Sequence, residues 1–166
     1  MKQFQYLIDN FIDRLANGLS YILVILIILV FSTVFFRYIF NISYIVIQEL
    51  IMYMHALIFM VGISYTLKER SHVRIDIIYN TLAKKNQLLI SSIGIIIFIL
   101  PTSLFITYIS LDMVSSSWMI LEGSSEAGGL NLIFILKTFI PVSGFLIFLQ
   151  GISELIKIQE IKNYDY

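Results

Sequence analysis

The sequence contains no cysteine and few charged residues. Its 166 residues include two histidines, and only 13% are Asp, Glu, Lys or Arg. The missing thiols exclude a disulfide framework, a thiol redox relay and thiolate metal ligation. A soluble domain has about 25% charged residues, so this composition, with 58% hydrophobic residues, excludes an ordinary soluble domain. The net charge of zero also gives no bulk attraction for nucleic acid.

The sequence contains several long runs of apolar residues. An α-helix needs about 20 apolar residues to cross a bilayer. Four stretches meet that length: residues 18–37, 47–67, 88–111 and 130–156. The first is too long for the apolar region of a signal peptide, so we interpret it as a retained anchor. We therefore predict a single all-α integral membrane domain, residues 1–166, with four transmembrane helices.

The segment before the first run has an apolar face of its own. Phe4, Leu7, Phe11 and Leu15 recur at helical spacing between charged residues. This pattern fits a helix lying in the membrane interface, and a solvated start to the first span fits it equally well.

Basic residues gather on one side of the predicted topology. The hairpin of residues 68–87 carries five of the eleven. Lys and Arg close to membrane spans mark the cytoplasmic side. Four spans put both termini on the side of this hairpin, so we expect both termini to be cytoplasmic. The loops of residues 38–46 and 112–129 are then periplasmic.

Ionisable residues near the spans are candidate functional residues, because a charge at membrane depth is costly unless it is paired or reaches water. Arg37 and Glu49 flank the first outer turn. Either both reach the headgroup region, or they form an ion pair that joins two helices or contacts a partner subunit. His55 lies about two turns into the second span, where a helix contact is a more common role than metal or haem ligation.

Motifs of enzymes are missing. The sequence has no Gly-rich phosphate loop and no nucleophile elbow. His72 and Asp76 are four residues apart with Arg74 between them, and a solvated or interfacial loop accounts for them without chemistry. We expect no enzymatic activity and no cofactor or metal.

Several short motifs occur in an order typical of one family. They are Phe36-Arg37-Tyr38, Gln48-Glu49-Leu50, Gly62-Ile63-Ser64-Tyr65-Thr66-Leu67-Lys68 and His72-Val73-Arg74-Ile75-Asp76, followed by residues 122–130, Lys137-Thr138-Phe139-Ile140-Pro141 and residues 149–155. In this order they resemble the small membrane subunit (DctQ type) of tripartite ATP-independent periplasmic (TRAP) transporters. The later motifs resemble the mannitol/chloroaromatic branch.

The resemblance implies a supporting role in secondary active transport across the bacterial inner membrane. A periplasmic solute-binding protein (DctP type) would deliver an organic solute to a large permease subunit (DctM type), which this chain would pack against and stabilise. On that reading Arg37, Glu49, His72, Arg74 and Asp76 are candidate interface or orientation residues.

The acidic outer loop has its own candidates, since Glu122 and Glu126 are placed to dock the binding protein. The rival interpretations are an unrelated structural four-helix protein and a small free-standing exporter. The first span lacks the buried carboxylate that such an exporter needs to couple protons. The arrangement of the helices stays open: short connections favour a compact bundle, and a subunit packed on a partner can hold its helices splayed.

Overall fold

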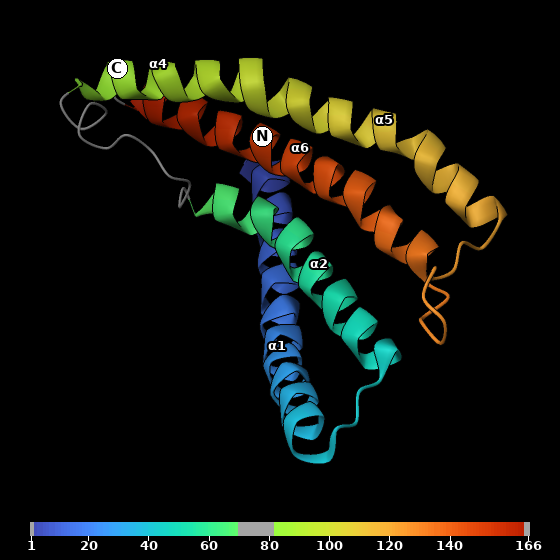
Figure 1. The fold of residues 1–166 in the computed structure, drawn as a ribbon. Helices are drawn as coiled ribbons and strands as arrows, with labels where there is room; N and C mark the ends of the chain where they lie inside the picture. The colour runs from blue at the N-terminus through green and yellow to red at the C-terminus, as the bar shows by residue number, and fades with distance from the viewer. Residues whose placement is uncertain (1, 70–81, 165–166) are drawn as a thin grey trace.

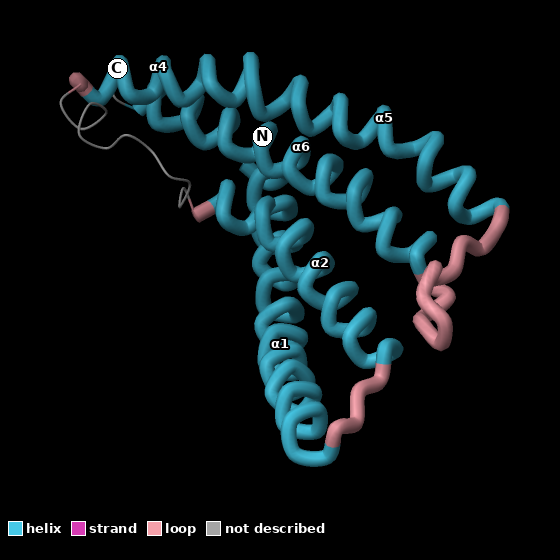
Figure 2. The backbone as a smooth tube through the Cα atoms, viewed as in Figure 1, coloured by secondary structure: helices cyan, strands magenta, loops and turns pink. Residues whose placement is uncertain are grey.

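The computed structural model describes residues 2–69 and 82–164, and these form helices joined by two loops (Figures 1 and 2). The elements are α1 (Lys2–Phe40), α2 (Ile45–Lys68), α4 (Lys84–Gly94), a π-helical turn η1 (Ile95–Ile99), α5 (Leu100–Met119) and α6 (Ile133–Tyr164). Strands are absent from these residues. The segment α4–η1–α5 is one continuous helical rod.

Four of these helical rods are long and apolar enough to cross a membrane: Lys2–Phe40, Ile45–Lys68, Lys84–Met119 and Ile133–Lys162. The predicted fold class, an all-α protein with four membrane-spanning helices, is therefore confirmed for the described part of the chain. The protein is a multi-pass integral membrane protein.

The helices run past the limits expected from the sequence. The 39 residues of α1 make a helix about 58 Å long, although the hydrocarbon core is only about 30 Å thick. The charged first turns of α1 therefore lie outside the hydrocarbon, or the helix is strongly tilted. The third rod continues to Met119, beyond Asp112 where the sequence placed its end, so Trp118 is helical.

The helices are splayed rather than bundled. Neighbours in space follow the order α1, α2, α6, α5, with a further contact between α1 and α6. The hairpin α1–α2 and the hairpin α5–α6 meet at one end, and the outer part of α1 diverges from α5 and α6 (Figures 1 and 2), whereas the outer end of α2 stays in contact with the loop of residues 120–132. Of the two arrangements that the sequence left open, the splayed one is present.

A small core lies where the two hairpins meet. Ile8 and Ile12 of α1 pack with Val61 of α2 and Leu146 of α6. The other apolar face at the start of α1 points away from this core, because Phe4, Leu7 and Phe11 are exposed. The core therefore joins three helices at one end of the molecule.

Small residues bring α5 and α6 close together. Ser103, Ser110 and Ser117, spaced seven residues apart, are all buried. A Cβ added at Gly144 of α6 would lie 2.9 Å from the backbone oxygen of Ser103. Small side chains allow this close approach between membrane helices, so the hairpin α5–α6 packs tightly along much of its length.

The third rod changes its helical pitch just before a proline. In η1 the N–H of Leu100 donates to the carbonyl of Ile95, five residues back, and Pro101 follows directly. Proline has no N–H and disturbs the ladder around it, and π turns are among the usual sites of helix distortion. The helix irregularity next to Pro101 thus takes the form of a π turn.

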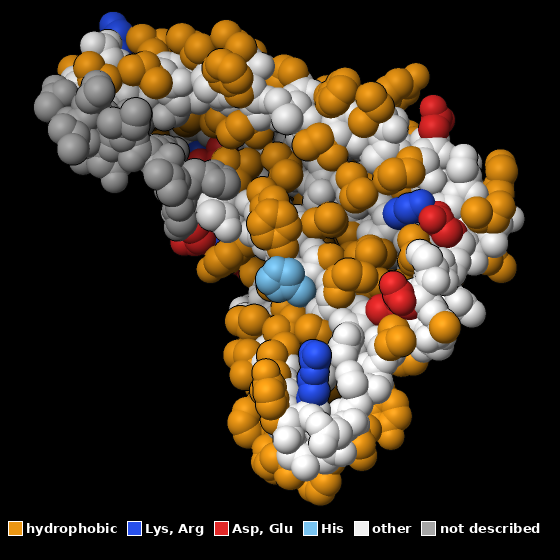
Figure 3. Space-filling model, in the orientation of Figure 1, with side chains coloured by type: hydrophobic (Ala, Val, Ile, Leu, Met, Phe, Trp, Pro, Cys, Tyr) orange, Lys and Arg blue, Asp and Glu red, His pale blue; other side chains and the backbone are white. Residues whose placement is uncertain are grey.

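The outer faces of the helices are strongly apolar. Phe31 and Phe98 are each 68% exposed and Phe105 is 63% exposed. Figure 3 shows hydrophobic side chains over both hairpins, with few charged groups between them. In a membrane these faces contact lipid or another apolar protein surface.

Candidate functional site

The loop between α5 and α6, residues 120–132, is folded on itself by backbone hydrogen bonds. The Ser124 N–H donates to the Leu130 carbonyl at 3.1 Å, and the Ile133 N–H donates to the Glu122 carbonyl at 3.1 Å. Gly128 has a φ of 81°, a conformation that costs glycine nothing and other residues more. The loop is consequently a structured surface at the end of the α5–α6 hairpin.

Glu122 closes this loop onto α6. Its carboxylate accepts a hydrogen bond from Ser117 Oγ at 2.6 Å and forms an ion pair with Lys137. The Lys137 ammonium, and after it the Ser117 hydroxyl, hold the pKa of the Glu122 carboxyl below its usual value. Glu122, a candidate docking residue, therefore has a clear role inside the chain.

Glu126 is the other docking candidate and is placed differently. Its backbone N–H donates to Ser124 Oγ at 3.1 Å, while the residue itself is exposed. Its carboxylate has no hydrogen bond or ion pair within the described part of the chain. Of the two carboxylates in the loop, Glu126 is the one without a hydrogen bond or ion pair to the described residues.

Glu49 connects the loop to α2. Its carboxylate accepts hydrogen bonds from Ser124 Oγ and from the backbone N–H of Leu130. Gly129 lies against this contact, because a Cβ added there would be 2.7 Å from Glu49 Oε1. Glu49 thus ties the outer end of α2 to the α5–α6 hairpin.

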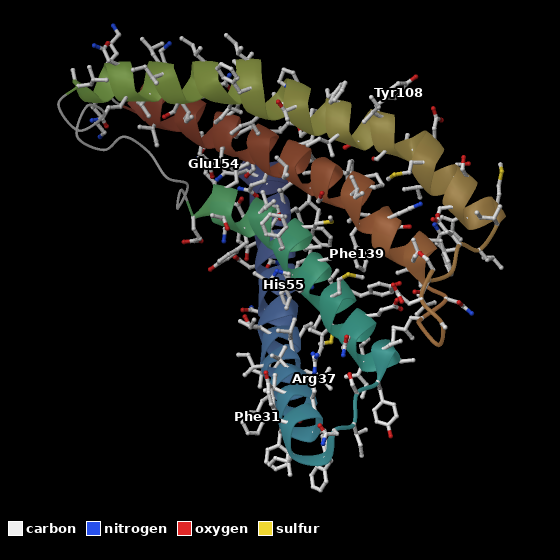
Figure 4. All side chains as sticks on the ribbon, in the orientation of Figure 1. Phe31, Arg37, His55, Tyr108, Phe139 and Glu154 are labelled. Carbon is white, nitrogen blue, oxygen red and sulfur yellow. The ribbon has the colours of Figure 1, made fainter. Side chains whose placement is uncertain are left out.

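Arg37 does not join this network. It lies in the last turn of α1, is exposed, and forms no ion pair with the residues that the structure describes. The ion pair between Arg37 and Glu49 that the sequence left open is not formed, since Glu49 binds the outer loop. Figure 4 shows Arg37 low on α1, far from the end where the hairpins meet.

His55 is exposed near the middle of α2. Its ring has no hydrogen-bond partner among residues 2–69 and 82–164. Figures 3 and 4 show the ring at the molecular surface, on the side of α2 that faces the viewer. A helix contact within this chain, the common role for a lone histidine, is therefore missing from the described structure.

A second polar cluster lies where the hairpins meet. Lys157 Nζ of α6 is 3.0 Å from Asp9 Oδ2 of α1 and also pairs with Glu154. Ser153 Oγ and Gln150 Nε2 donate to Asp9 Oδ1 at 2.8 and 3.2 Å. Gln150, Ser153 and Glu154 are almost fully buried. One turn further along α1, Asp13 pairs with Lys68 of α2.

The sequence interpretation did not single out this cluster, although a signal was present. Gln150, Ser153, Glu154 and Lys157 recur at three- and four-residue intervals in an apolar helix, which places them on one face. Asp9 and Asp13 are likewise four residues apart. Polar stripes of this kind on two helices predict that the stripes face each other.

The remaining candidates lie elsewhere. His72, Arg74 and Asp76 fall outside the described residues. Within the described ranges, no group of three or more His, Asp or Glu side chains is placed to hold a metal ion.

Comparison with known proteins supplies the family. No curated protein matches the sequence. The family model of the DctQ component of tripartite ATP-independent periplasmic transporters matches residues 26–160, a range that begins within α1 and includes nearly all of α6. With four membrane-spanning helices in addition, the chain belongs to the DctQ component family of TRAP transporters and is a transporter subunit rather than an enzyme.

Proposed function

We propose that this chain is the small permease subunit of a TRAP transporter in a bacterial inner membrane. It packs against a large permease subunit of the DctM type and stabilises it. The complex then takes up an organic solute that a DctP-type periplasmic protein delivers, driven by an ion gradient. The family match over residues 26–160 supports this assignment.

The observation that carries the proposal is the exposure of His55. It lies ten residues from the start of α2, which corresponds to a depth of about 15 Å along the helix. A polar ring facing lipid there lacks the hydrogen bonds that water gives it, and such residues face protein or a water-filled cavity. Because the described part of this chain offers no partner, the ring fits a polar group on another membrane subunit.

The splayed hairpins suit a scaffold. Among the residues that the structure describes, polar contacts between the two hairpins lie at the Asp9–Lys157 cluster and at the Glu49–Ser124 contact, and much of the outer surface of the helices is apolar. In alternating access one part of a transporter moves against a fixed part. A wide apolar subunit that packs against the fixed part of the transporter makes that part larger.

The orientation follows from the distribution of basic residues. The amino terminus, the end of α2, the start of α4 and the end of α6 share one end of the molecule (Figure 1). Most of the lysines and arginines belong to these segments, which supports cytoplasmic termini. The hairpin with His72, Arg74 and Asp76 then serves as a cytoplasmic anchor.

The outer loop is the proposed docking surface. Its exposed Glu126 faces the periplasm in this orientation and is available to the solute-binding protein. The folded segment of residues 122–130 also carries the resemblance to the mannitol/chloroaromatic branch, to which we assign the chain.

Reconstitution tests the scaffold role. The neighbouring large subunit is placed in liposomes with and without this chain, and binding-protein-dependent solute uptake is measured. We expect uptake only when both subunits are present, and co-purification of the two from detergent. Full uptake and equal thermal stability of the large subunit alone would refute the scaffold role.

A further inference from the structure

Gln150 of α6 is completely buried, yet one end of its side-chain amide is unused. The residue is 0% exposed. Its Nε2 group donates to Asp9 Oδ1 at 3.2 Å, whereas its Oε1 atom accepts no hydrogen bond from the residues that the structure describes. A buried oxygen without a donor is costly, and nearly all such atoms in native proteins have a partner. Oε1 therefore calls for a donor from outside the described side chains.

The orientation of this amide is fixed by the carboxylate beside it. Turning the amide over would set Oε1 against an oxygen of Asp9, and an ionised carboxylate only accepts hydrogen bonds. Asp9 is ionised in this arrangement, because it pairs with Lys157 Nζ at 3.0 Å and accepts from Ser153 Oγ at 2.8 Å. The unsatisfied atom is therefore the oxygen, and its partner is a hydrogen-bond donor or a cation.

The packing around Gln150 limits the size of that partner. Leu146, one turn earlier on α6, belongs to the core and is 4% exposed. At Gly151, α6 lies so close to the third rod that an added Cβ would be 3.0 Å from Leu100 Cδ2. Because Gln150 has no exposed surface, a lipid or a side chain of another subunit does not reach Oε1. Only a water molecule or a small ion is compact enough.

The charges at this place favour water over a cation. A second cation beside Asp9 would be repelled by the Lys157 ammonium, which lies 3.0 Å from Asp9 Oδ2. The described residues also hold no group of three or more His, Asp or Glu side chains placed for a metal ion. Water carries no net charge, donates two hydrogen bonds and accepts others, so it suits a carbonyl oxygen close to an ammonium group.

We infer that one buried water molecule donates to Gln150 Oε1 and accepts from Lys157 Nζ. The two side chains reach the two oxygens of the Asp9 carboxylate, at 3.2 and 3.0 Å, so they converge at one point between α1 and α6. An ammonium has three N–H donors, and the pairs with Asp9 and Glu154 use two of them. The water is thus part of the contact between the first and last helices, and the inference does not depend on the proposed function.

The test is a high-resolution crystal structure of the full-length chain bound to an antibody fragment, with and without a thallium(I) soak. We expect a water peak about 2.5–3.0 Å from Gln150 Oε1 and no anomalous thallium signal at that position. An absent peak, a thallium signal in its place, or a protein donor on Oε1 would each overturn the inference.

Variants show whether Gln150 holds this water. Gln150→Met keeps the length of the side chain without an acceptor and should lose the peak. Gln159→Met, at an exposed position on the same helix, is the matched control and should keep it. A water retained in Gln150→Met, or lost in Gln159→Met, would contradict the assignment of Oε1 as its acceptor. The wild-type structure decides the inference by itself if Gln150→Met does not fold.

Discussion

Asp9 Oδ2 of α1 lies 3.0 Å from Lys157 Nζ of α6, so an ion pair joins the first helix of the chain to the last. Both side chains are less than one-fifth exposed. Together with the Asp13–Lys68 pair between α1 and α2, this contact fixes three helices at the end where the hairpins meet. The relative position of the two hairpins therefore depends on this polar cluster at one end and on the Glu49–Ser124 contact at the outer end of α2.

Replacing Lys157 by Met should destabilise the protein by about 3 kcal/mol, because it leaves Asp9 and Glu154 without their shared cation. Unfolding in mixed detergent micelles, followed by circular dichroism, measures this loss. Lys162→Met on the same helix is the control and should have little effect. In a double-mutant cycle, Asp9→Asn should recover part of the stability lost in Lys157→Met, and strictly additive losses would contradict a direct interaction.

Lowering the pH should loosen the outer loop through Glu122. Lys137 holds the pKa of this carboxyl below its usual value, which is about 4.3 in an unfolded chain. Its contribution to stability is therefore complete above that pH and is lost as the pH falls through the lower folded value. Melting temperatures between pH 7 and pH 3 measure the loss, and Glu122→Gln should have a flatter profile at the acidic end. An identical profile in the variant would exclude this carboxyl as the source.

Adding a methyl group at Gly129 should separate the outer loop from α2. The new Cβ would lie 2.6 Å from Ser124 Cβ and 2.7 Å from Glu49 Oε1, the two side chains that form this contact, which is closer than packing allows and costs about 1–3 kcal/mol. Limited proteolysis of the loop in membrane vesicles should become faster for Gly129→Ala. Gly62→Ala, where an added Cβ meets nothing within 4 Å, is the matched control. Equal cleavage of the two variants would show that the Glu49 contact does not restrain the loop.

His55→Leu should weaken the complex with the large subunit by about tenfold, since it removes a polar contact at membrane depth. It should leave the melting temperature of the isolated chain unchanged. Co-purification at graded detergent concentration measures the first effect and thermal unfolding the second. Tyr108→Leu, an exposed polar aromatic on α5 (Figure 4), is the control. Normal assembly of His55→Leu would exclude the His55 ring from the interface.

Charge reversal at Glu126 should impair delivery by the binding protein. Its carboxylate is exposed and does not hold the loop together, so Glu126→Lys changes the surface alone. We expect the half-saturating concentration of binding protein in a transport assay to change about three- to tenfold, with an effect that weakens at high salt. Glu126→Gln should give a smaller change in the same direction. An unchanged concentration would exclude Glu126 from docking.

The sequence predicted the parts of this fold that depend on local composition. Runs of apolar residues long enough to span a bilayer have no stable alternative to helices, so the four helices follow from length and hydropathy. The third helix continues past Asp112 to Met119, beyond the predicted span of residues 88–111, because a single exposed carboxylate near the interface costs little. The residue at which a helix ends depends on such small energies, whereas the presence of a membrane-spanning helix does not.

Contacts between distant residues were harder to predict. For Glu49 and Arg37, which flank one turn, the sequence left open either contact with the headgroup region or an ion pair, yet the Glu49 carboxylate accepts hydrogen bonds from Ser124 and Leu130 of a later loop. The spacing of the polar residues that end at Lys157 predicts a stripe on one face of α6. The sequence does not predict that Asp9 of α1 faces this stripe, because that contact depends on how the two hairpins cross. Periodicity gives the face of a helix and leaves its neighbour undetermined.

The π turn at Ile95–Ile99 also sets the rotational phase of the third rod. A π turn contains one residue more than the α-helix that it replaces, and each α-helical residue turns the rod by about 100°. Deleting one residue from this turn would restore an ordinary ladder and leave the membrane span almost the same length. It would also rotate α4 against α5 and carry Lys85 and Leu88 away from α6. Length changes at this point therefore alter which side chains meet at the end of the rod, and not whether the rod crosses the bilayer.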